Sequence, residues 1–232
     1  MIEQKKRVTS IDGFRGILAL IIALFHFGQS YPIGPFFHRG YFAVEVFFMI
    51  SGFLFIQSLD SKKKNFCPSA LFISKLCRLY PGYLFSIVAL IMLYSVAWFY
   101  GNPVAWIVSD AGHRVSFIAE ILGIQVTGVA DLIYINGPVW YVSALLCTSA
   151  VLILLYWITS EKFFDILTAL AALVIYVALY VYNPAMDSAG FLDSNKLVSI
   201  PLLRGIAGMC FGIVLYRLNR GIEKRWVWTT KV

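Results

Sequence analysis

The sequence has few charged residues for its length. Of its 232 residues, 13% are Asp, Glu, Lys or Arg and 60% are hydrophobic, and the mean hydropathy is +0.79. This composition excludes a water-soluble globule, because too little polar surface is available to cover one. A basic face with interleaved aromatic residues is also missing, so the net charge of +7 does not indicate nucleic-acid binding.

Cysteine pairs at characteristic spacings are absent as well. The four cysteines, Cys67, Cys77, Cys147 and Cys210, are widely separated, and two of them lie in apolar segments. Neither a disulfide framework nor a metal site is therefore expected. The chain also lacks internal repeats, low-complexity tracts and a soluble segment of domain size, so we expect residues 1–232 to form one transmembrane domain.

Long hydrophobic stretches are the main feature that the sequence does have. They predict an all-α, polytopic transmembrane bundle with about six spanning helices, near residues 11–29, 41–59, 82–100, 138–158, 164–182 and 199–218. If both termini are cytoplasmic, almost all loop lysines and arginines lie on that side, and Arg39, Arg114 and Lys196 lie outside. This bias indicates a multi-pass protein of the cell membrane with both ends inside.

The first stretch has an alternative interpretation. A basic start followed by an apolar run is also typical of a secretory signal peptide. Against this, Arg15 and His26 interrupt the apolar run, and residues 28–30 make a poor cleavage site. Between the third and fourth stretches, the helical spacing of Phe117, Ile118 and Ile121 predicts an amphipathic helix over residues 116–126.

Two ionisable residues in the first stretch indicate a functional face. Arg15 and His26 are eleven positions apart, which on a helix gives about three turns and roughly 16 Å of rise, so both project from nearly the same side. Gly16, Ala19 and Ala23 are expected to line that side and admit a neighbouring helix. Alternatively, Arg15 reaches the inner headgroups and His26 is a core histidine.

Glu45 is the corresponding residue of the second stretch. It lies near the outer end of its span, at a depth similar to that of His26, so the two side chains are expected to be within contact distance. A carboxylate beside an imidazole would make His26 a general base, although the same pair would also serve as a purely structural hydrogen bond. Ser51, in the middle of this span, is expected to bond a helical carbonyl or a neighbouring helix.

Several segments together resemble the membrane-bound acyltransferase-3 family. The first two are residues 11–16 followed by His26, and residues 40–53 with Glu45 ahead of Phe47-Phe48 and Ser51-Gly52-Phe53. The others are a basic segment at 75–81, a Trp-centred segment at 137–143 and an Arg- and Gly-containing segment at 204–212. Their common order along nearly the whole chain makes the resemblance specific, although each motif alone is weak.

The resemblance implies transfer of an acyl group, usually acetyl, from cytoplasmic acyl-coenzyme A to a hydroxyl of a bacterial envelope carbohydrate. His26 would be the catalytic base, with Arg15 its motif partner and Glu45 at an acidic motif position. Lys75 and Arg78 would bind the donor, since coenzyme A phosphates require cations. Positive-inside anchoring would equally explain these two basic residues.

The chain departs from the family in three ways. Lys75 stands where the family more often has arginine, Leu145 stands where it often has an acidic residue, and family members are usually longer with more helices. The shorter length predicts a truncated chain, a short variant, or half of a site completed by a homo-oligomer or a second chain. A transporter or flippase of envelope lipids or saccharides and an inactive membrane scaffold are the alternative functions.

Overall fold

The computed structural model describes residues 9–31, 39–61, 66–101, 111–129, 135–182 and 199–229. Within these ranges the long elements are all helices, namely α1 (Thr9–Ser30), α2 (Phe42–Ser61), α3 (Pro68–Phe99), α4 (Ala111–Ile121), α5 (Trp140–Ile158), α6 (Glu161–Tyr182) and α7 (Ile200–Thr229). Two short 3-10 turns, η4 (Gln125–Thr127) and η5 (Gly137–Val139), lie between α4 and α5.

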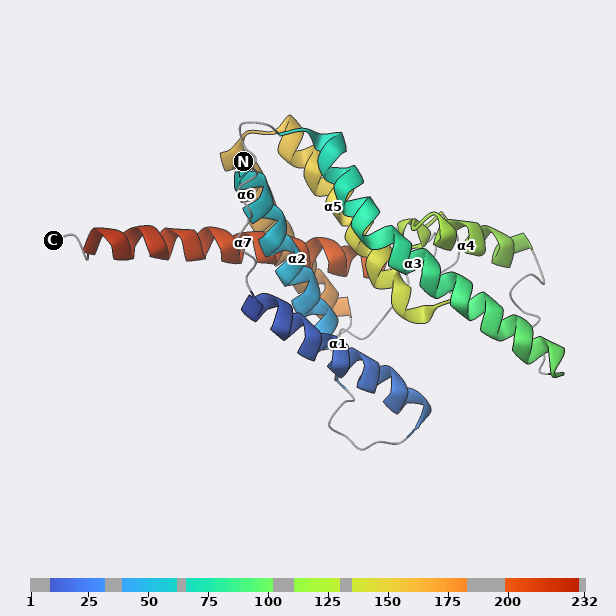
Figure 1. Cartoon of the computed structure of the whole chain (residues 1–232). Helices are drawn as coiled ribbons and strands as arrows, with labels where there is room; N and C mark the ends of the chain where they lie inside the picture. Colours follow the sequence, from blue (N-terminus) through green and yellow to red (C-terminus); the bar gives the residue numbers. More distant parts are fainter. Residues whose placement is uncertain are drawn as a thin grey trace, which may run out of the picture.

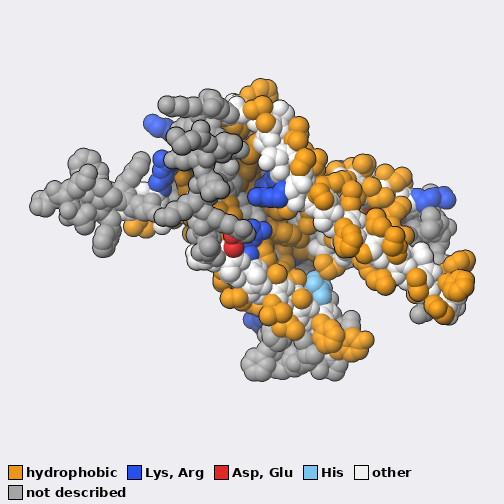
Figure 2. Space-filling view, viewed as in Figure 1, with side chains coloured by type: hydrophobic (Ala, Val, Ile, Leu, Met, Phe, Trp, Pro, Cys, Tyr) orange, Lys and Arg blue, Asp and Glu red, His pale blue; other side chains and the backbone are white. Residues whose placement is uncertain are grey.

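Six of the described helices are long and apolar enough to cross a bilayer. They are α1, α2, α3, α5, α6 and α7, and they follow the predicted stretches in order, which confirms the all-α transmembrane fold. The cytoplasmic position of the two termini stays a prediction. Large apolar side chains on α1, α3 and α6 are exposed. Figure 2 shows hydrophobic atoms over α3 and α1 on one face of the molecule, and such a surface suits contact with lipid.

Helix α7 crosses the other helices and packs against α2, α5 and α6 (Figure 1). Its contact with α2 is unusually close because glycines face backbone there. A Cβ atom added to Gly52 would lie 1.9 Å from the Met209 carbonyl oxygen, and one added to Gly212 would lie 1.9 Å from that of Met49. Gly208 and Gly212 have the four-residue spacing that lets transmembrane helices approach closely.

The third spanning helix begins earlier than predicted. The hydropathy of the sequence placed this span near residues 82–100. Instead α3 begins at Pro68 and contains Pro81 in its interior. A proline removes one helical hydrogen bond, which membrane helices tolerate where neighbouring groups compensate. The basic segment 75–81 therefore lies within the helix and not ahead of it.

The segment between α3 and α5 is anchored by tyrosine and serine hydroxyls. Tyr80 and Tyr83 of α3 donate to the carbonyl oxygens of Ile121 and Glu120, and Ser143 of α5 donates to that of Gly123 across 2.7 Å. The helix predicted over 116–126 is found in part, because α4 begins earlier, at Ala111, and ends at Ile121, and a turn and η4 follow it. Its buried face contains Ser116, Ala119 and Glu120, whereas Ile118 and Leu122 are exposed.

Candidate functional site

Arg15 and His26 lie on the same face of α1. Both are half-buried, and between them on that face are Leu18, which is buried, and Ile22, which packs against the central apolar core. Gly16, Ala19 and Ala23 are exposed instead, so their prediction as the packing stripe was wrong. The side chains of Leu18 and Ile22 pack between α1 and the bundle. Because these side chains are large, α1 does not approach its neighbours as closely as a stripe of small residues would allow.

His26 lies where α1 approaches the start of α2. The Phe25 ring contacts both the His26 ring, at 5.2 Å between centroids, and the Tyr41 ring, at 5.8 Å. Tyr41 immediately precedes α2, whose first residue is Phe42. His26 is therefore near the end of the bundle where α2 begins, while Arg15 is about 16 Å from it along α1.

Glu45 has different partners from the one predicted. Among the described residues, its Oε1 atom accepts from Nε of Arg204 at 2.5 Å, and its Oε2 atom accepts from the Tyr176 hydroxyl at 3.1 Å. The expected contact with His26 was therefore wrong. The Glu45 side chain points toward α6 and α7 and not toward α1.

Arg204 is the residue that the sequence analysis missed as the partner of Glu45. Its side chain is 3% exposed and that of Glu45 is 6% exposed. The guanidinium also lies over the Trp140 ring at 5.0 Å, a cation–π geometry, and its second terminal nitrogen is buried without a described partner. The sequence did contain an indication of this pair. Glu45 and Arg204 each lie within the first two turns of their helices, and the two helices start at the same end of the bundle.

A pair of hydroxyl groups on two other helices includes Tyr141, which interacts electrostatically with Arg15. Ser51 Oγ of α2 and the Tyr141 hydroxyl of α5 are 3.4 Å apart, and the Arg15 guanidinium is close enough to Tyr141 to act on it electrostatically. The Tyr141 ring is held by Phe47 and Phe48, at centroid distances of 5.9 and 4.6 Å. The expectation that Ser51 bonds a neighbouring helix is confirmed.

Lys75 and Arg78 occupy different surroundings on α3. Lys75 Nζ donates to Ser149 Oγ at 2.5 Å and lies 5.3 Å from the centre of the Phe55 ring, so it points between α2 and α5. Arg78 is exposed. Because Ser149 is near the middle of the 19 residues of α5, Lys75 lies well inside the bundle and not at its edge. Figure 2 shows Lys and Arg atoms in the hollow between the α1–α2 side and the α3–α5 side.

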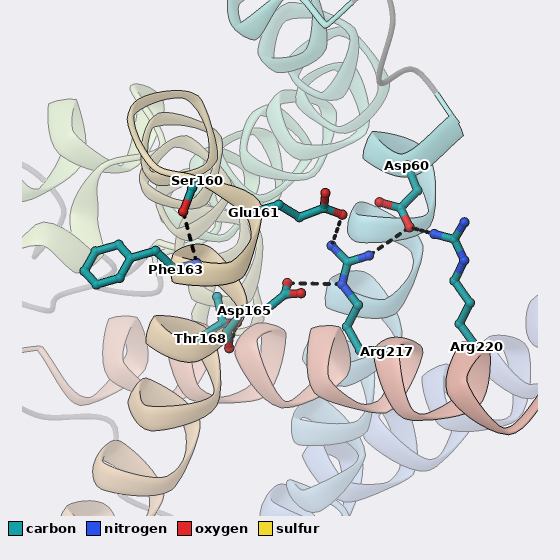
Figure 3. Close-up of polar contacts among 8 residues, drawn as sticks. All are labelled: Asp60, Ser160, Glu161, Phe163, Asp165, Thr168, Arg217 and Arg220. Carbon is teal, nitrogen blue, oxygen red and sulfur yellow. Dashed lines mark hydrogen bonds and ion pairs between the residues drawn. The ribbon is translucent and has the colours of Figure 1, made fainter.

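A network of ion pairs closes the opposite end of the bundle from His26 (Figure 3). Arg217 of α7 binds Asp60 of α2 at 2.9 Å, and Glu161 and Asp165 of α6 at 3.3 and 3.1 Å. Arg220 also contacts Asp60. Since these carboxylates would repel one another without Arg217, the network is a clamp that joins three helices.

Glu120 is a buried carboxylate outside the spanning helices. Its two oxygens accept from the backbone N–H groups of Ile135 and Asn136, at 2.7 and 3.0 Å. Burial raises the pKa of Glu120, and the two backbone hydrogen bonds oppose that shift. Glu120 therefore serves as a link between α4 and the chain entering α5. Across the described ranges, no group of three or more His, Cys, Asp or Glu is arranged to hold a metal ion.

Comparison with known proteins gives two matches. The family described as "Acyltransferase domain" matches residues 8–232. A curated protein of Rhizobium radiobacter, "Protein 2 in picA locus", is 28% identical to the chain over 145 residues, which cover 60% of this chain and 73% of that protein. No solved structure matches the chain.

Proposed function

The chain belongs to this acyltransferase domain family, and on that premise we propose that it transfers an acetyl group from acetyl-coenzyme A to a hydroxyl of an envelope carbohydrate. Membrane acyl transfer follows from the family together with the six apolar helices. The donor, the acetyl group and the acceptor are parts of the proposal, as is the location in a bacterial cell membrane.

The observation that carries the proposal is the orientation of α1. A histidine and an arginine on one helix both lie on the face that packs against the bundle, although the opposite face carries exposed apolar side chains. Ionisable groups inside a membrane bundle mark a substrate path or a reaction site. Because Arg15 and His26 are roughly 16 Å apart along the helix, they act on different parts of the bound substrates.

In the proposed reaction, His26 accepts the proton of the acceptor hydroxyl. The hydroxyl oxygen then attacks the thioester carbonyl carbon, the new C–O ester bond forms and the C–S bond breaks. The proton that His26 holds passes to the departing thiolate, so the products are the O-acetyl ester and free coenzyme A. His26 lies at the end of the bundle predicted to face outward, which suits an envelope acceptor.

Donor phosphates are assigned to the basic residues of α3. Arg78 is exposed and offers a planar fork for phosphate oxygens, while Lys75 lies deeper and is tied to Ser149. Glu45, in contrast, is occupied by Arg204 and Tyr176, so we assign it the role of holding α2, α6 and α7 in register beside the site.

The test is label transfer in membranes that contain the whole chain. We expect His26→Ala to lose transfer of labelled acetyl from acetyl-coenzyme A to carbohydrate while the protein still inserts. The matched control is Phe27→Ala, the next position on α1, whose side chain is 52% exposed and faces away from the bundle. Undiminished transfer by His26→Ala would overturn the assignment of His26, and saccharide movement without thioester cleavage in the unaltered protein would favour a transporter instead.

A further inference from the structure

Polar groups of four helices form three levels along α2, which together we name the polar column. At the first level, His26 lies beside the start of α2 through the rings of Phe25 and Tyr41. Ser51 defines the second level with Tyr141 and Arg15, and Phe55 defines the third with Lys75. Helical rise separates Ser51 from Phe55 by about 6 Å and from the start of α2 by roughly 14 Å.

The middle level brings polar groups of three helices together beside aromatic rings. Two half-buried hydroxyls, those of Ser51 and Tyr141, meet at 3.4 Å, longer than the usual separation for a hydroxyl pair. The Arg15 charge, on a third helix, interacts electrostatically with Tyr141, and two aromatic rings, Phe47 and Phe48, pack against the tyrosine. These groups offer several donors and acceptors beside an apolar surface.

We propose that Tyr141, together with Ser51 and Arg15, binds the pantetheine arm of the donor. This inference rests on the proposed function. In coenzyme A the pantetheine arm joins the phosphates to the thioester, so a donor with its phosphates at Arg78 and Lys75 and its thioester toward His26 must pass the middle level. The arm carries two amides and a hydroxyl, which need hydrogen-bond partners once they leave water.

The side chains of the middle level suit the pantetheine arm better than they suit the phosphates or the thioester of the donor. Hydroxyls can both donate to an amide carbonyl and accept from an amide N–H, and the guanidinium of Arg15 donates to a carbonyl oxygen. Phe47 and Phe48 provide apolar contact for the methyl and methylene groups of the arm. Tyr141 is thus assigned as a donor-binding residue and not as an acid or base in the reaction.

The experiment compares two donors with the purified full-length protein in lipid nanodiscs. Acetyl-coenzyme A and acetyl-pantetheine share the arm, but acetyl-pantetheine has no phosphate. We expect Tyr141→Phe to raise KM for both donors roughly three- to tenfold, which corresponds to one lost hydrogen bond, with kcat and the acceptor KM unchanged. Arg78→Gln should raise KM for acetyl-coenzyme A only.

The matched control is Tyr180→Phe on α6, which removes a hydroxyl from a side chain that is 60% exposed and away from the polar column. It should leave both KM values unchanged. If Tyr141→Phe lowers the melting temperature of the protein, Ser51→Ala provides the second variant with the same expected pattern. Unchanged KM values for both donors, in the Tyr141 and the Ser51 variants, would overturn the inference.

A binding measurement separates failure of this inference from failure of the proposed function. The Kd of free coenzyme A is measured by titration calorimetry without any acceptor. If the unaltered protein binds coenzyme A, and Tyr141→Phe weakens binding threefold or more, the subsite stands even where no acetyl transfer is observed. If the unaltered protein does not bind coenzyme A, both the donor assignment and the subsite are contradicted.

Discussion

Arg204 and Glu45 form an ion pair inside the bundle, with Nε of Arg204 2.5 Å from Oε1 of Glu45. Both side chains are nearly inaccessible to solvent, and Tyr176 and Trp140 complete their surroundings. An isolated charge is costly in such a place, whereas a paired and hydrogen-bonded one is tolerated. The pair therefore fixes how α2 and α7 meet next to the proposed site.

Glu45→Ala should lower the free energy of unfolding by about 3–5 kcal/mol, because it leaves the Arg204 charge buried without its partner. Tyr176→Phe removes only one hydrogen bond to the same carboxylate and should cost about 1.5–3 kcal/mol. Chemical unfolding of the purified protein in detergent measures both.

The control for this prediction is the double replacement Glu45→Ala with Arg204→Met. Removing both charges should recover most of the stability that the single change loses. A double variant no more stable than Glu45→Ala alone would show that the loss came from packing and not from an unpaired charge.

Gly212→Ala should destabilise the contact between α2 and α7. The added methyl carbon would lie 1.9 Å from the Met49 carbonyl oxygen, so the two backbones must separate. Overpacking of this kind typically costs about 1–3 kcal/mol. Gly82→Ala on α3 is the control, because a Cβ atom there meets nothing within 4 Å. Equal melting temperatures for the two variants would contradict the close approach of α2 and α7.

Arg217→Ala should destabilise the protein more than Arg220→Ala does. Arg217 contacts three carboxylates, on α2 and α6, whereas Arg220 contacts only Asp60 among the described residues. Solvent screening reduces the effect, since Glu161 and Asp165 are more than a third exposed, so we expect about 1–2 kcal/mol for Arg217→Ala. Thermal unfolding at low and high salt measures the difference, which should shrink in high salt. A larger loss for Arg220→Ala would contradict the clamp.

Glu120 predicts how the segment between α3 and α5 responds to pH. Burial raises the pKa of Glu120 above its ordinary value of 4.5, so the protonated form is favoured in the folded segment. The stability that protonated Glu120 adds to the folded segment is fully present below pH 4.5. It is lost as the pH rises through the higher pKa that Glu120 has in the folded protein. Hydrogen exchange of the segment should therefore speed up from pH 4.5 to 7 beyond the intrinsic change in exchange rate.

Glu120→Gln should remove that pH dependence, because the amide does not titrate. The variant should also exchange faster overall at pH 4.5, since its NH2 group replaces one of the two acceptors that the backbone N–H groups of Ile135 and Asn136 use. An unchanged pH profile in this variant would remove Glu120 as the titrating group.

The sequence predicted the spanning helices and the shared face of Arg15 and His26, because both follow from hydropathy and helical periodicity. It failed where the answer depended on which way a side chain turns. The position of Glu45 along its helix was estimated from the sequence, but such an estimate does not distinguish α1 from α7 as the neighbour. The start of α3 was wrong because Lys75 forms a hydrogen bond with Ser149 inside the bundle, a contact between residues far apart in the sequence.

Cysteine accessibility along α1 tests most directly whether Arg15 and His26 face a hydrated interior. In a background with Cys67, Cys77, Cys147 and Cys210 replaced by alanine, single Cys replacements of Arg15, Ile17, Leu20 and His26 are exposed to a membrane-impermeant, charged thiol reagent. We expect Arg15→Cys and His26→Cys to react with the reagent. Ile17 and Leu20, which are 59% and 61% exposed, lie on the apolar face of α1, so Ile17→Cys and Leu20→Cys should stay unlabelled in the bilayer. Labelling of the Ile17 and Leu20 variants with protection of the other two would contradict the account.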